Sequence, residues 1–302
     1  MVWPVAGQER APYVWAATGK LITPRANACA VSLGDGRVLV AGGDGVDGPL
    51  ASAEWYGDDA VFHSAAPMAR ARSHAACAAL PDGRVLVAGG QPGSDGGPGA
   101  EIYDPIADQW QAAANEPLSR WGQTASVLSD GRVLLAGGQS DAGATAALEV
   151  FHPSTNSFEL LSSTLTTPRT LHAAAALEDD RVLIVGGSDG RQFLNTADLV
   201  DLETGEVQPL PDLAKARAEH SLTTLLDGTV LVAGGRNGEG DMSSSLLYLP
   251  AENRFVEGPT LNLARSGHQA LRIPGNGNVL LIGGASGGEA RMSAIATFSM
   301  MG

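Results

Sequence analysis

The sequence is short of lysine, cysteine and aromatic side chains. Of its 302 residues, two are lysines (Lys20 and Lys215), two are cysteines, and Phe, Trp and Tyr together make up 5%. Asp and Glu number 33 against 19 Lys and Arg, which gives a net charge of −14. Because so acidic a surface repels phosphate-bearing partners, we expect no binding to nucleic acid or to anionic membranes.

Long apolar runs and a leader sequence are also missing. No stretch is long and apolar enough to span a membrane. The first ten residues, MVWPVAGQER, do not have the pattern of a signal peptide. We expect a protein that is either cytoplasmic or exported with its leader absent from this sequence, and we expect it to be a monomer.

One phrase is repeated six times along the chain. The copies are DGRVLVAGG (35–43), DGRVLVAGG (82–90), DGRVLLAGG (130–138), DDRVLIVGG (179–187), DGTVLVAGG (227–235) and GNVLLIGG (277–284). The first glycines of successive Gly-Gly pairs are 47, 48, 49, 48 and 49 residues apart. A period this regular indicates an array of one supersecondary unit. We therefore expect a single domain over residues 1–302.

Each repeat predicts four short antiparallel strands, as the second repeat illustrates. Residues 74–80 form a strand of small residues, 81–83 an Asp-Gly turn, and 84–90 an apolar strand buried on both faces. After a loop, 101–105 and 108–114 form the third and fourth strands. Such sheets bury both faces by packing around an axis, which is the β-propeller solution.

The two ends of the chain predict that the propeller closes. The last repeat stops after its third strand at 294–300, and residues 13–25 align with 108–120, which places Trp15 on Trp110. We expect the N-terminal strand, about 13–22, to complete the last blade and leave no open edge. The predicted fold is all-β: a six-bladed propeller of four-stranded antiparallel blades.

The two cysteines fall in the same predicted strand of adjacent repeats. Cys29 lies four residues after Arg25, whereas Cys77 lies five residues after Arg72. We expect a small apolar role for each cysteine in preference to a disulfide between them.

The repeats resemble kelch repeats, in which a Gly-Gly pair is followed by a Tyr and then, about seven residues on, by a Trp. The Tyr position, 14 residues after the first Gly, holds Tyr56, Tyr103, Phe151, Val200, Tyr248 and Thr297. The Trp position holds Trp110, Phe158, Val207 and Phe255, with Phe62 one residue early and Trp15 supplied by the N-terminus. The sequence looks most like the Gly- and Ala-rich kelch proteins of bacteria. The resemblance implies a kelch-type propeller, a fold that hosts binding modules and enzymes alike.

The long, varied loops between the second and third strands should share one face of the ring with the connections between blades. In kelch proteins that resemble this one, ligands commonly dock on this face. An arginine begins each blade there: Arg25, Arg72, Arg120, Arg169, Arg217 and Arg265. These arginines have two possible roles, a clamp for an anionic ligand or ion pairs with carboxylates at the start of the third strand.

The carboxylates needed for such ion pairs are present in four repeats only. The third strand opens with Glu54, Glu101, Glu149 and Asp198 in repeats one to four, and with Leu246 and Ile295 in repeats five and six. An anion site is therefore predicted over blades five and six. Its contacts would be Arg217, Arg265, Arg236 and Arg291, with Arg25 and Arg169 as further candidates.

Three histidines recur three residues after their arginines: His172, His220 and His268. A three-histidine metal site is conceivable where the strands converge. However, no carboxylate or cysteine repeats beside the histidines, so we expect a structural role, no metal and no cofactor. The sequence also shows no nucleophile–base motif and no phosphate-binding glycine loop.

We therefore expect a binding or scaffold module that recognises a protein segment or a glycan on the loop face, rather than an enzyme. The alternative is a small-molecule or carbohydrate-active enzyme, of oxidase or epimerase type, with its site at the channel mouth.

Overall fold

The structure is a computed structural model that describes residues 21–25, 27–57, 59, 61–92, 99–272, 279–282, 285–287, 289–290 and 295–298. Within these ranges the chain forms strands and turns and no helix. Accordingly, no helix in this part of the chain has the length and apolar character of a membrane span. Arg291, Trp15 and most of the predicted closing strand at 13–22 lie outside the described residues.

Five four-stranded antiparallel sheets and one three-stranded sheet follow one another along the described chain. The first two sheets contain β1 (Cys29–Ser32), β2 (Val38–Ala41), β5 (Ala53–Tyr56) and β6 (Phe62–Ala65), then β8 (Ala76–Ala79), β9 (Val85–Ala88), β11 (Ala100–Asp104) and β12 (Gln109–Ala112). The third and fourth contain β13 (Thr124–Val127), β14 (Val133–Ala136), β17 (Ala147–His152) and β18 (Ser157–Thr164), then β19 (Ala173–Ala176), β20 (Arg181–Val185), β21 (Ala197–Asp201) and β22 (Val207–Pro209). The last two contain β23 (Ser221–Thr224), β24 (Val230–Ala233), β27 (Ser245–Leu249) and β28 (Arg254–Glu257), then β29 (Gln269–Arg272), β30 (Val279–Ile282) and β33 (Ile295–Phe298).

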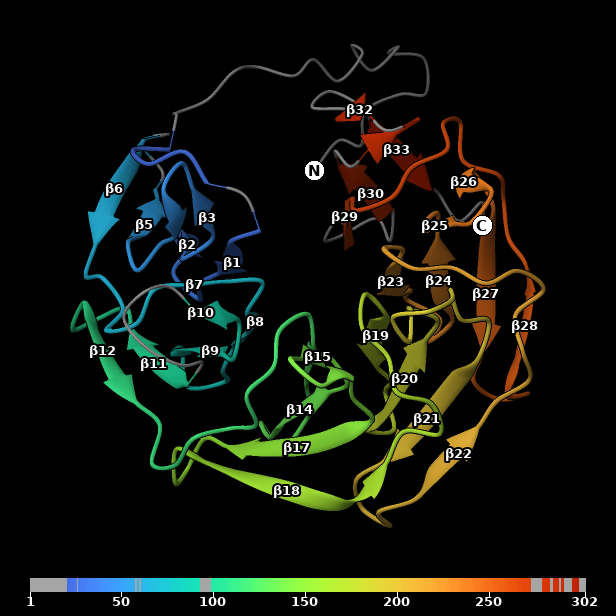
Figure 1. The fold of residues 1–302 in the computed structure, drawn as a ribbon, viewed down its shortest axis with the longest axis horizontal. Helices are drawn as coiled ribbons and strands as arrows, with labels where there is room; N and C mark the ends of the chain where they lie inside the picture. The colour runs from blue at the N-terminus through green and yellow to red at the C-terminus, as the bar shows by residue number, and fades with distance from the viewer. Residues whose placement is uncertain are drawn as a thin grey trace, which may run out of the picture.

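The sheets stand side by side around a common centre (Figure 1). The first strands of successive sheets contact one another in the order β1, β8, β13, β19, β23 and β29, while β6, β12, β18, β22 and β28 lie on the outside (Figure 1). Buried Val, Leu and Ala side chains of the second and third strands fill the spaces between neighbouring sheets. This all-β architecture of repeated antiparallel sheets fits a β-propeller.

The Gly-Gly pairs join each sheet to the next. The N–H of the second glycine donates to the carbonyl of the next arginine, as in Gly43 to Arg72 and Gly187 to Arg217, both at 2.8 Å. A Cβ on the preceding glycine would lie 2.5 Å from the Arg72 carbonyl at Gly42 and 2.3 Å from that of Arg217 at Gly186. Glycine is therefore required at the first position because the backbone of the next sheet occupies the space of a side chain.

The aromatic pairs lie in register, as the kelch resemblance implies. Tyr103 pairs with Trp110 across β11 and β12, with ring centroids 4.9 Å apart. Phe151 faces Phe158 at 5.0 Å in the third sheet. In the fourth sheet Val200 pairs with Val207, so the packing at this position is aliphatic there, as predicted.

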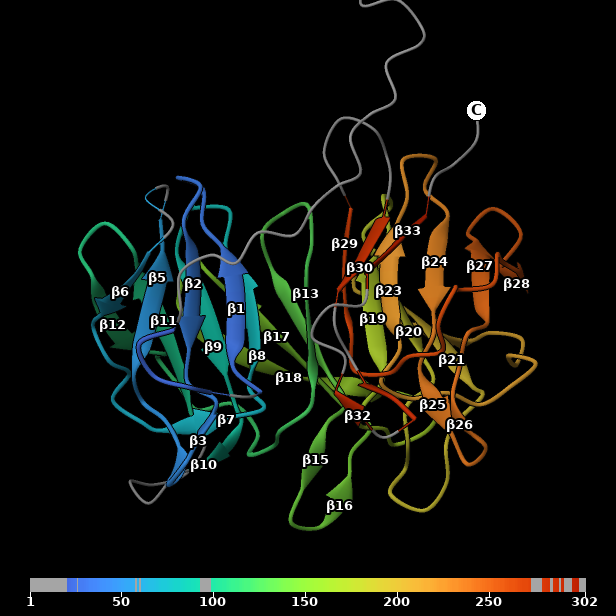
Figure 2. The same cartoon turned by 90° about the horizontal axis from the view of Figure 1, so that it is seen from above.

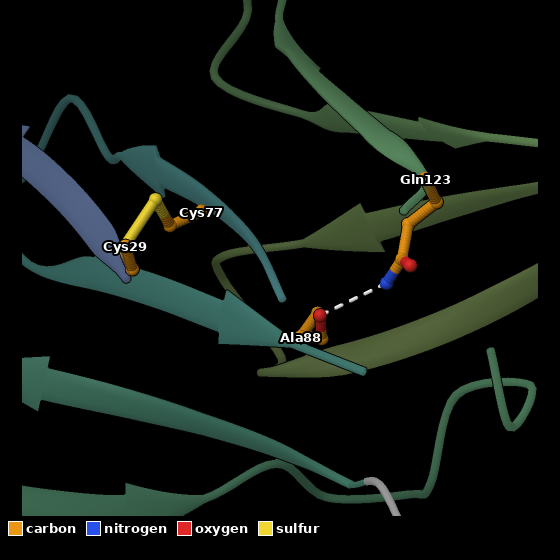
Figure 3. The surroundings of a disulfide bond; sticks show 4 residues. All are labelled: Cys29, Cys77, Ala88 and Gln123. Atoms are coloured by element: carbon orange, nitrogen blue, oxygen red, sulfur yellow. Dashed lines mark hydrogen bonds between the residues drawn. A yellow bond between two sulfur atoms is a disulfide. The ribbon is translucent and has the colours of Figure 1, made fainter. Parts of the chain in front are cut away.

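The cysteines correct one sequence-based expectation. Cys29 and Cys77 form a disulfide between β1 and β8, with their Cα atoms 5.9 Å apart (Figure 3). Neighbouring sheets present opposite faces to each other, and successive residues of a strand alternate between faces. The one-residue offset between the cysteines therefore allows the two sulfur atoms to meet, and the expectation of two separate apolar cysteines was wrong.

Short two-stranded ribbons extend from the large sheets on one side of the molecule (Figure 2). They are β3 (Asp44–Gly45) with β4 (Gly48–Pro49), β7 (Arg72–Ser73) with β10 (Gln91–Pro92), β15 (Gln139–Ser140) with β16 (Gly143–Ala144), β25 (Arg236–Asn237) with β26 (Gly240–Asp241), and β31 (Ala285–Ser286) with β32 (Glu289–Ala290). Four of these ribbons belong to second-to-third-strand loops, and β7–β10 joins such a loop to the connection that precedes β8, so the side that carries them is the loop face. The Asp-Gly turns lie on the opposite side, the turn face.

Candidate functional site

The arginines that begin the first four blades are buried in ion pairs. The pairs are Arg25–Glu54 at 2.7 Å, Arg72–Glu101 at 2.8 Å, Arg120–Glu149 at 2.7 Å and Arg169–Asp198 at 2.9 Å. Each guanidinium also donates to the carbonyl of the first glycine in its own blade, as in Arg72 to Gly89 at 2.9 Å. The predicted carboxylate pairing is confirmed, and these arginines hold the second and third strands of each blade together.

Arg217 occupies the same position without a carboxylate. It is 1% exposed and donates to the carbonyls of Gly234 at 3.0 Å and Ser244 at 3.3 Å, and to the Ser244 hydroxyl at 3.2 Å. Burial, with no opposing charge, lowers the pKa of Arg217 to about 10. Arg265 is 2% exposed, and burial lowers its pKa as well. Ligand contact at these two arginines stays a prediction, and their burial means that a ligand would have to reach beneath the loops.

Arg236 is exposed, unlike the other members of the predicted anion site that the structure describes. It begins β25 on the loop face, and its guanidinium carbon lies 5.9 Å from the centroid of the Phe193 ring. Its Nη1 atom is 3.8 Å from the carboxylate of Glu219, so its charge is partly neutralised. The arrangement places a cation, a carboxylate and an aromatic ring together at the surface.

The three repeated histidines lie beneath the loop face, just before β19, β23 and β29. His172 Nε2 is 3.0 Å from the Thr124 hydroxyl, and His268 Nε2 is 2.9 Å from the Ser221 hydroxyl. Each hydroxyl lies four residues after the arginine of the preceding blade. Ala173 stands at that position before His220, and among the described residues no side chain forms a hydrogen bond with either ring nitrogen of His220.

Burial keeps these histidines neutral. The pKa of His172 is lowered to about 3 and that of His268 to about 4, first by burial and then by nearby arginines. Burial, Arg217 and the two neighbouring histidines lower the pKa of His220 well below its ordinary value.

Gln123 occupies the position of these histidines in the third blade, and it donates to the Ala88 carbonyl at 2.9 Å (Figure 3). The described residues contain no group of three His, Cys, Asp or Glu side chains placed to hold a metal ion.

A set of residues that sequence analysis missed lies one position before these histidines. The rim residues, two positions after each arginine, are Asn27, His74, Gly122, Leu171, Glu219 and Gly267, and all have φ between 51° and 65°. The N–H of one rim residue donates to the rim carbonyl of the preceding blade along two runs, 27–74–122 and 171–219–267, at 2.8 to 3.1 Å. Because they precede the innermost strands, the rim residues lie at the loop-face end of the space between the sheets. Sequence analysis could have found this position, because it holds glycine in two repeats and larger residues in the other four.

Two groups of side chains stand on this rim. In the first rim cluster, Asp44 accepts a hydrogen bond from Asn27 Nδ2 at 2.9 Å and lies 3.7 Å from His74 Nδ1. Burial raises the pKa of Asp44, but hydrogen bonds from Asn27 and Ser73 and the nearby His74 outweigh it and hold the pKa below its ordinary value. The second rim cluster, in blades four and five, consists of Leu171, Glu219, Arg236 and Phe193.

Three cavities of about 430, 350 and 450 Å³ lie on the turn face, between successive blades. They are lined by the Asp-Gly turns of two neighbouring sheets and by the third-to-fourth turn of one. In two of these gaps an arginine reaches across to the next sheet, Arg37 to the Pro105 carbonyl at 3.1 Å and Arg84 to that of Pro153 at 2.9 Å. Because they recur between successive blades and are lined by equivalent turns, we attribute them to the packing of the fold.

Comparisons with known proteins agree with this architecture. Residues 168–214 match the sequence family described as Kelch motif. None of the curated proteins compared matches the chain. Among solved structures, the fold is similar to that of a fungal alcohol oxidase of the AA5 family in complex with copper, with a TM-score of 0.71 and 18% sequence identity.

The match with the oxidase covers 86% of this chain and 58% of the other, so this chain spans little more than half of that protein's length. At 18% identity the likeness shows the fold alone. The motif match at 168–214 supports a kelch-repeat family for this chain.

Proposed function

We propose that this chain is a binding or scaffold module that recognises a protein segment or a glycan on its loop face. The observation that carries the proposal is the concentration of varied loops and ribbons on one side of a rigid set of sheets (Figure 2). Buried arginine hydrogen bonds fix the strands from which these loops extend. Kelch repeats commonly mediate protein–protein interaction, which supports the same class of function.

The proposal includes a closed six-bladed ring formed by one domain over residues 1–302, similar to the Gly- and Ala-rich kelch proteins of bacteria. The sixth described sheet has three strands, and the predicted strand at 13–22 would supply the fourth. Deletion of residues 1–22 should lower the thermal unfolding temperature and promote self-association through the exposed edge. A deletion variant that is as stable and monomeric as the parent would contradict closure.

Any anionic ligand is proposed to meet Arg236 first, with Arg217, Arg265 and Arg291 as deeper or neighbouring contacts and Arg25 and Arg169 as further candidates. Arg236 has the accessible guanidinium, at 49% side-chain exposure. Arg236→Ala should weaken binding of an acidic sugar or peptide, and Arg191→Ala, in the loop of the adjacent blade, is the control. Equal effects of the two substitutions on affinity would show that Arg236 is not a specific ligand contact.

The second candidate function is an enzyme of the oxidase or epimerase type at the channel mouth, which the fold similarity to an alcohol oxidase favours. The copper in that protein is not matched by a metal-ligand group among the residues described here. Two of the buried histidines are instead bonded to Thr124 and Ser221. We therefore derive no copper chemistry for this chain, and turnover of an alcohol or sugar by metal-loaded protein would favour the enzyme.

Face-selective blocking tests the proposed module directly. Glu239, on the loop-face ribbon β25–β26, and Ile106, 97% exposed on the turn face, are each replaced by cysteine and coupled to polyethylene glycol. The native cysteines are held in their disulfide. Binding to glycan and peptide arrays should fall for the Glu239→Cys conjugate and persist for the Ile106→Cys conjugate. The reverse pattern would contradict a loop-face site.

A further inference from the structure

We infer that the ligand of the proposed loop-face site is a neutral oligosaccharide chain that lies across the axis between the two rim clusters. This inference rests on the proposed function and names its ligand class. It depends on three observations: side chains kept in a costly backbone conformation, the balance of charge in the two clusters, and the position of the two rim glycines.

Positive φ at every rim position favours glycine, and Gly122 and Gly267 show that glycine is compatible with the repeat. His74, Leu171 and Glu219 adopt the same conformation at φ values of 54° to 55°, which costs free energy for a residue with a Cβ. None of the three side chains is buried: Leu171 is 42% exposed, and the side chains of His74 and Glu219 are 34% and 28% exposed. Residues that keep an unfavourable backbone conformation, and whose side chains do not pack in the core, indicate a functional role.

Each rim cluster contains one carboxylate with polar side chains beside it. Asp44 has Asn27 and His74 beside it, and Glu219 has Arg236 at 3.8 Å. An anionic ligand would meet two carboxylates, and a cationic one would meet Arg236. Carboxylate, amide and guanidinium groups suit sugar hydroxyls, which both donate and accept. Leu171 and the Phe193 ring add apolar surface for the C–H face of a sugar.

A peptide is a poorer fit because most of the rim backbone is already used in hydrogen bonds. The runs 27–74–122 and 171–219–267 use rim N–H and carbonyl groups in hydrogen bonds between blades. An extended peptide that adds to a sheet needs a row of free backbone groups. The chemistry that remains for a ligand on the rim is mainly that of side chains, which favours a glycan.

The positions of the two rim glycines define the path that the ligand takes across the rim. In the proposed six-bladed ring, Gly122 in blade three and Gly267 in blade six lie opposite each other, with the first rim cluster on one side and the second on the other. A Cβ built on Gly267 would meet nothing closer than Glu219 Oε2 at 4.0 Å, so the space above it is open. At Gly122, which follows half-buried Trp121, a Cβ would lie 2.9 Å from the Thr170 hydroxyl, so the Thr170 side chain borders the rim there. A linear chain is proposed to pass over Gly122, beside this hydroxyl, and to leave the rim through the open space at Gly267.

Calorimetric titration with cellohexaose, xylohexaose and mannohexaose, and with the matching disaccharides, tests the inference. At least one hexasaccharide should bind more tightly than its disaccharide. His74→Gly and Glu219→Gly should weaken that binding about tenfold or more while the unfolding temperature stays equal or rises, because glycine relieves the backbone. Gly267→Asn, which tolerates positive φ, should reduce hexasaccharide affinity to that of the disaccharide. Ile106→Ala, on the turn face, is the matched control and should change nothing.

Failure of this inference is distinguishable from failure of the proposed function. Binding of only peptides or acidic sugars, blocked by the conjugate at position 239, would overturn the neutral-glycan inference and leave the module intact. Unchanged hexasaccharide affinity in His74→Gly and Glu219→Gly would overturn the role of the rim. Ligand binding blocked only by the conjugate at position 106 would overturn the loop-face site itself.

Discussion

Arg169 and Asp198 form an ion pair of 2.9 Å in which both side chains are 0% exposed. Arg217, one blade further on, has the equivalent backbone contacts, but Leu246 occupies the strand position at which the other blade has its carboxylate. Removal of Arg169 would leave the buried Asp198 carboxylate without its partner, whereas removal of Arg217 would leave no buried charge unpaired. The two blades therefore allow one substitution to be compared in two electrostatic settings.

Arg169→Met should cost about 3–5 kcal/mol because Asp198 would remain buried without its partner. Arg217→Met should cost less, about 1–3 kcal/mol, since it removes hydrogen bonds to two carbonyls and a hydroxyl. Urea denaturation of both variants measures the difference. Asp82→Ala, which breaks the exposed Arg84–Asp82 pair, is the control and should cost under about 1 kcal/mol. Equal losses for the two methionine variants would contradict the distinction.

The buried histidines predict a loss of stability in mild acid. Their folded pKa values lie below the ordinary 6.5, so the unfolded chain binds more protons as the pH falls below about 6.5. Stability is fully present above that pH. His172 and His268 should each remove roughly 2 kcal/mol between pH 7 and pH 5, and His220 should act in the same direction.

The free energy of unfolding, measured by urea titration across this range, checks the histidine effect. Replacement of His172, His220 and His268 by glutamine, the residue that the third blade has as Gln123, should flatten the pH dependence. A parent protein with no change in stability between pH 7 and pH 5 would contradict the account.

Ala173→Ser should stabilise the protein by about 1 kcal/mol because it places a hydroxyl where Thr124 and Ser221 bond the histidines of other blades. In the part of the chain that the structure describes, no side chain forms a hydrogen bond with either ring nitrogen of His220. Thermal unfolding compares this variant with Ala174→Ser, whose side chain points to the other face of β19 and packs against apolar neighbours. The control should be neutral or less stable than the parent, and the same result for Ala173→Ser would show that the hydroxyl does not reach His220.

The disulfide predicts that a reductant lowers stability. Cys29 and Cys77 are 48 residues apart, and closing a loop of that length in the unfolded chain is worth up to about 4 kcal/mol. Thermal unfolding with and without dithiothreitol measures the loss, and the Cys29→Ser, Cys77→Ser double variant should not respond to the reductant. An unreduced protein whose mass shows two free thiols after alkylation would contradict the bond.

The sequence predicted the sheets well because the repeat determines them locally. Tyr103 and Trp110 pair as their spacing implies, and Glu101 meets Arg72 as the repeated carboxylates imply. The sequence predicted the disulfide wrongly, because whether Cys29 faces Cys77 depends on how two sheets turn toward each other. The rim was missed for a related reason: hydrogen bonds such as Glu219 to Leu171 join residues of different blades.

Hydrogen exchange of the protein with and without a bound hexasaccharide tests the central claim that the loop face is the binding site. Slower exchange is expected in the loop-face ribbons, at 44–49 and 236–241, with no change in the turns at 34–36, 82–84 and 227–229. Slower exchange confined to those turns would place the ligand on the turn face and contradict the account.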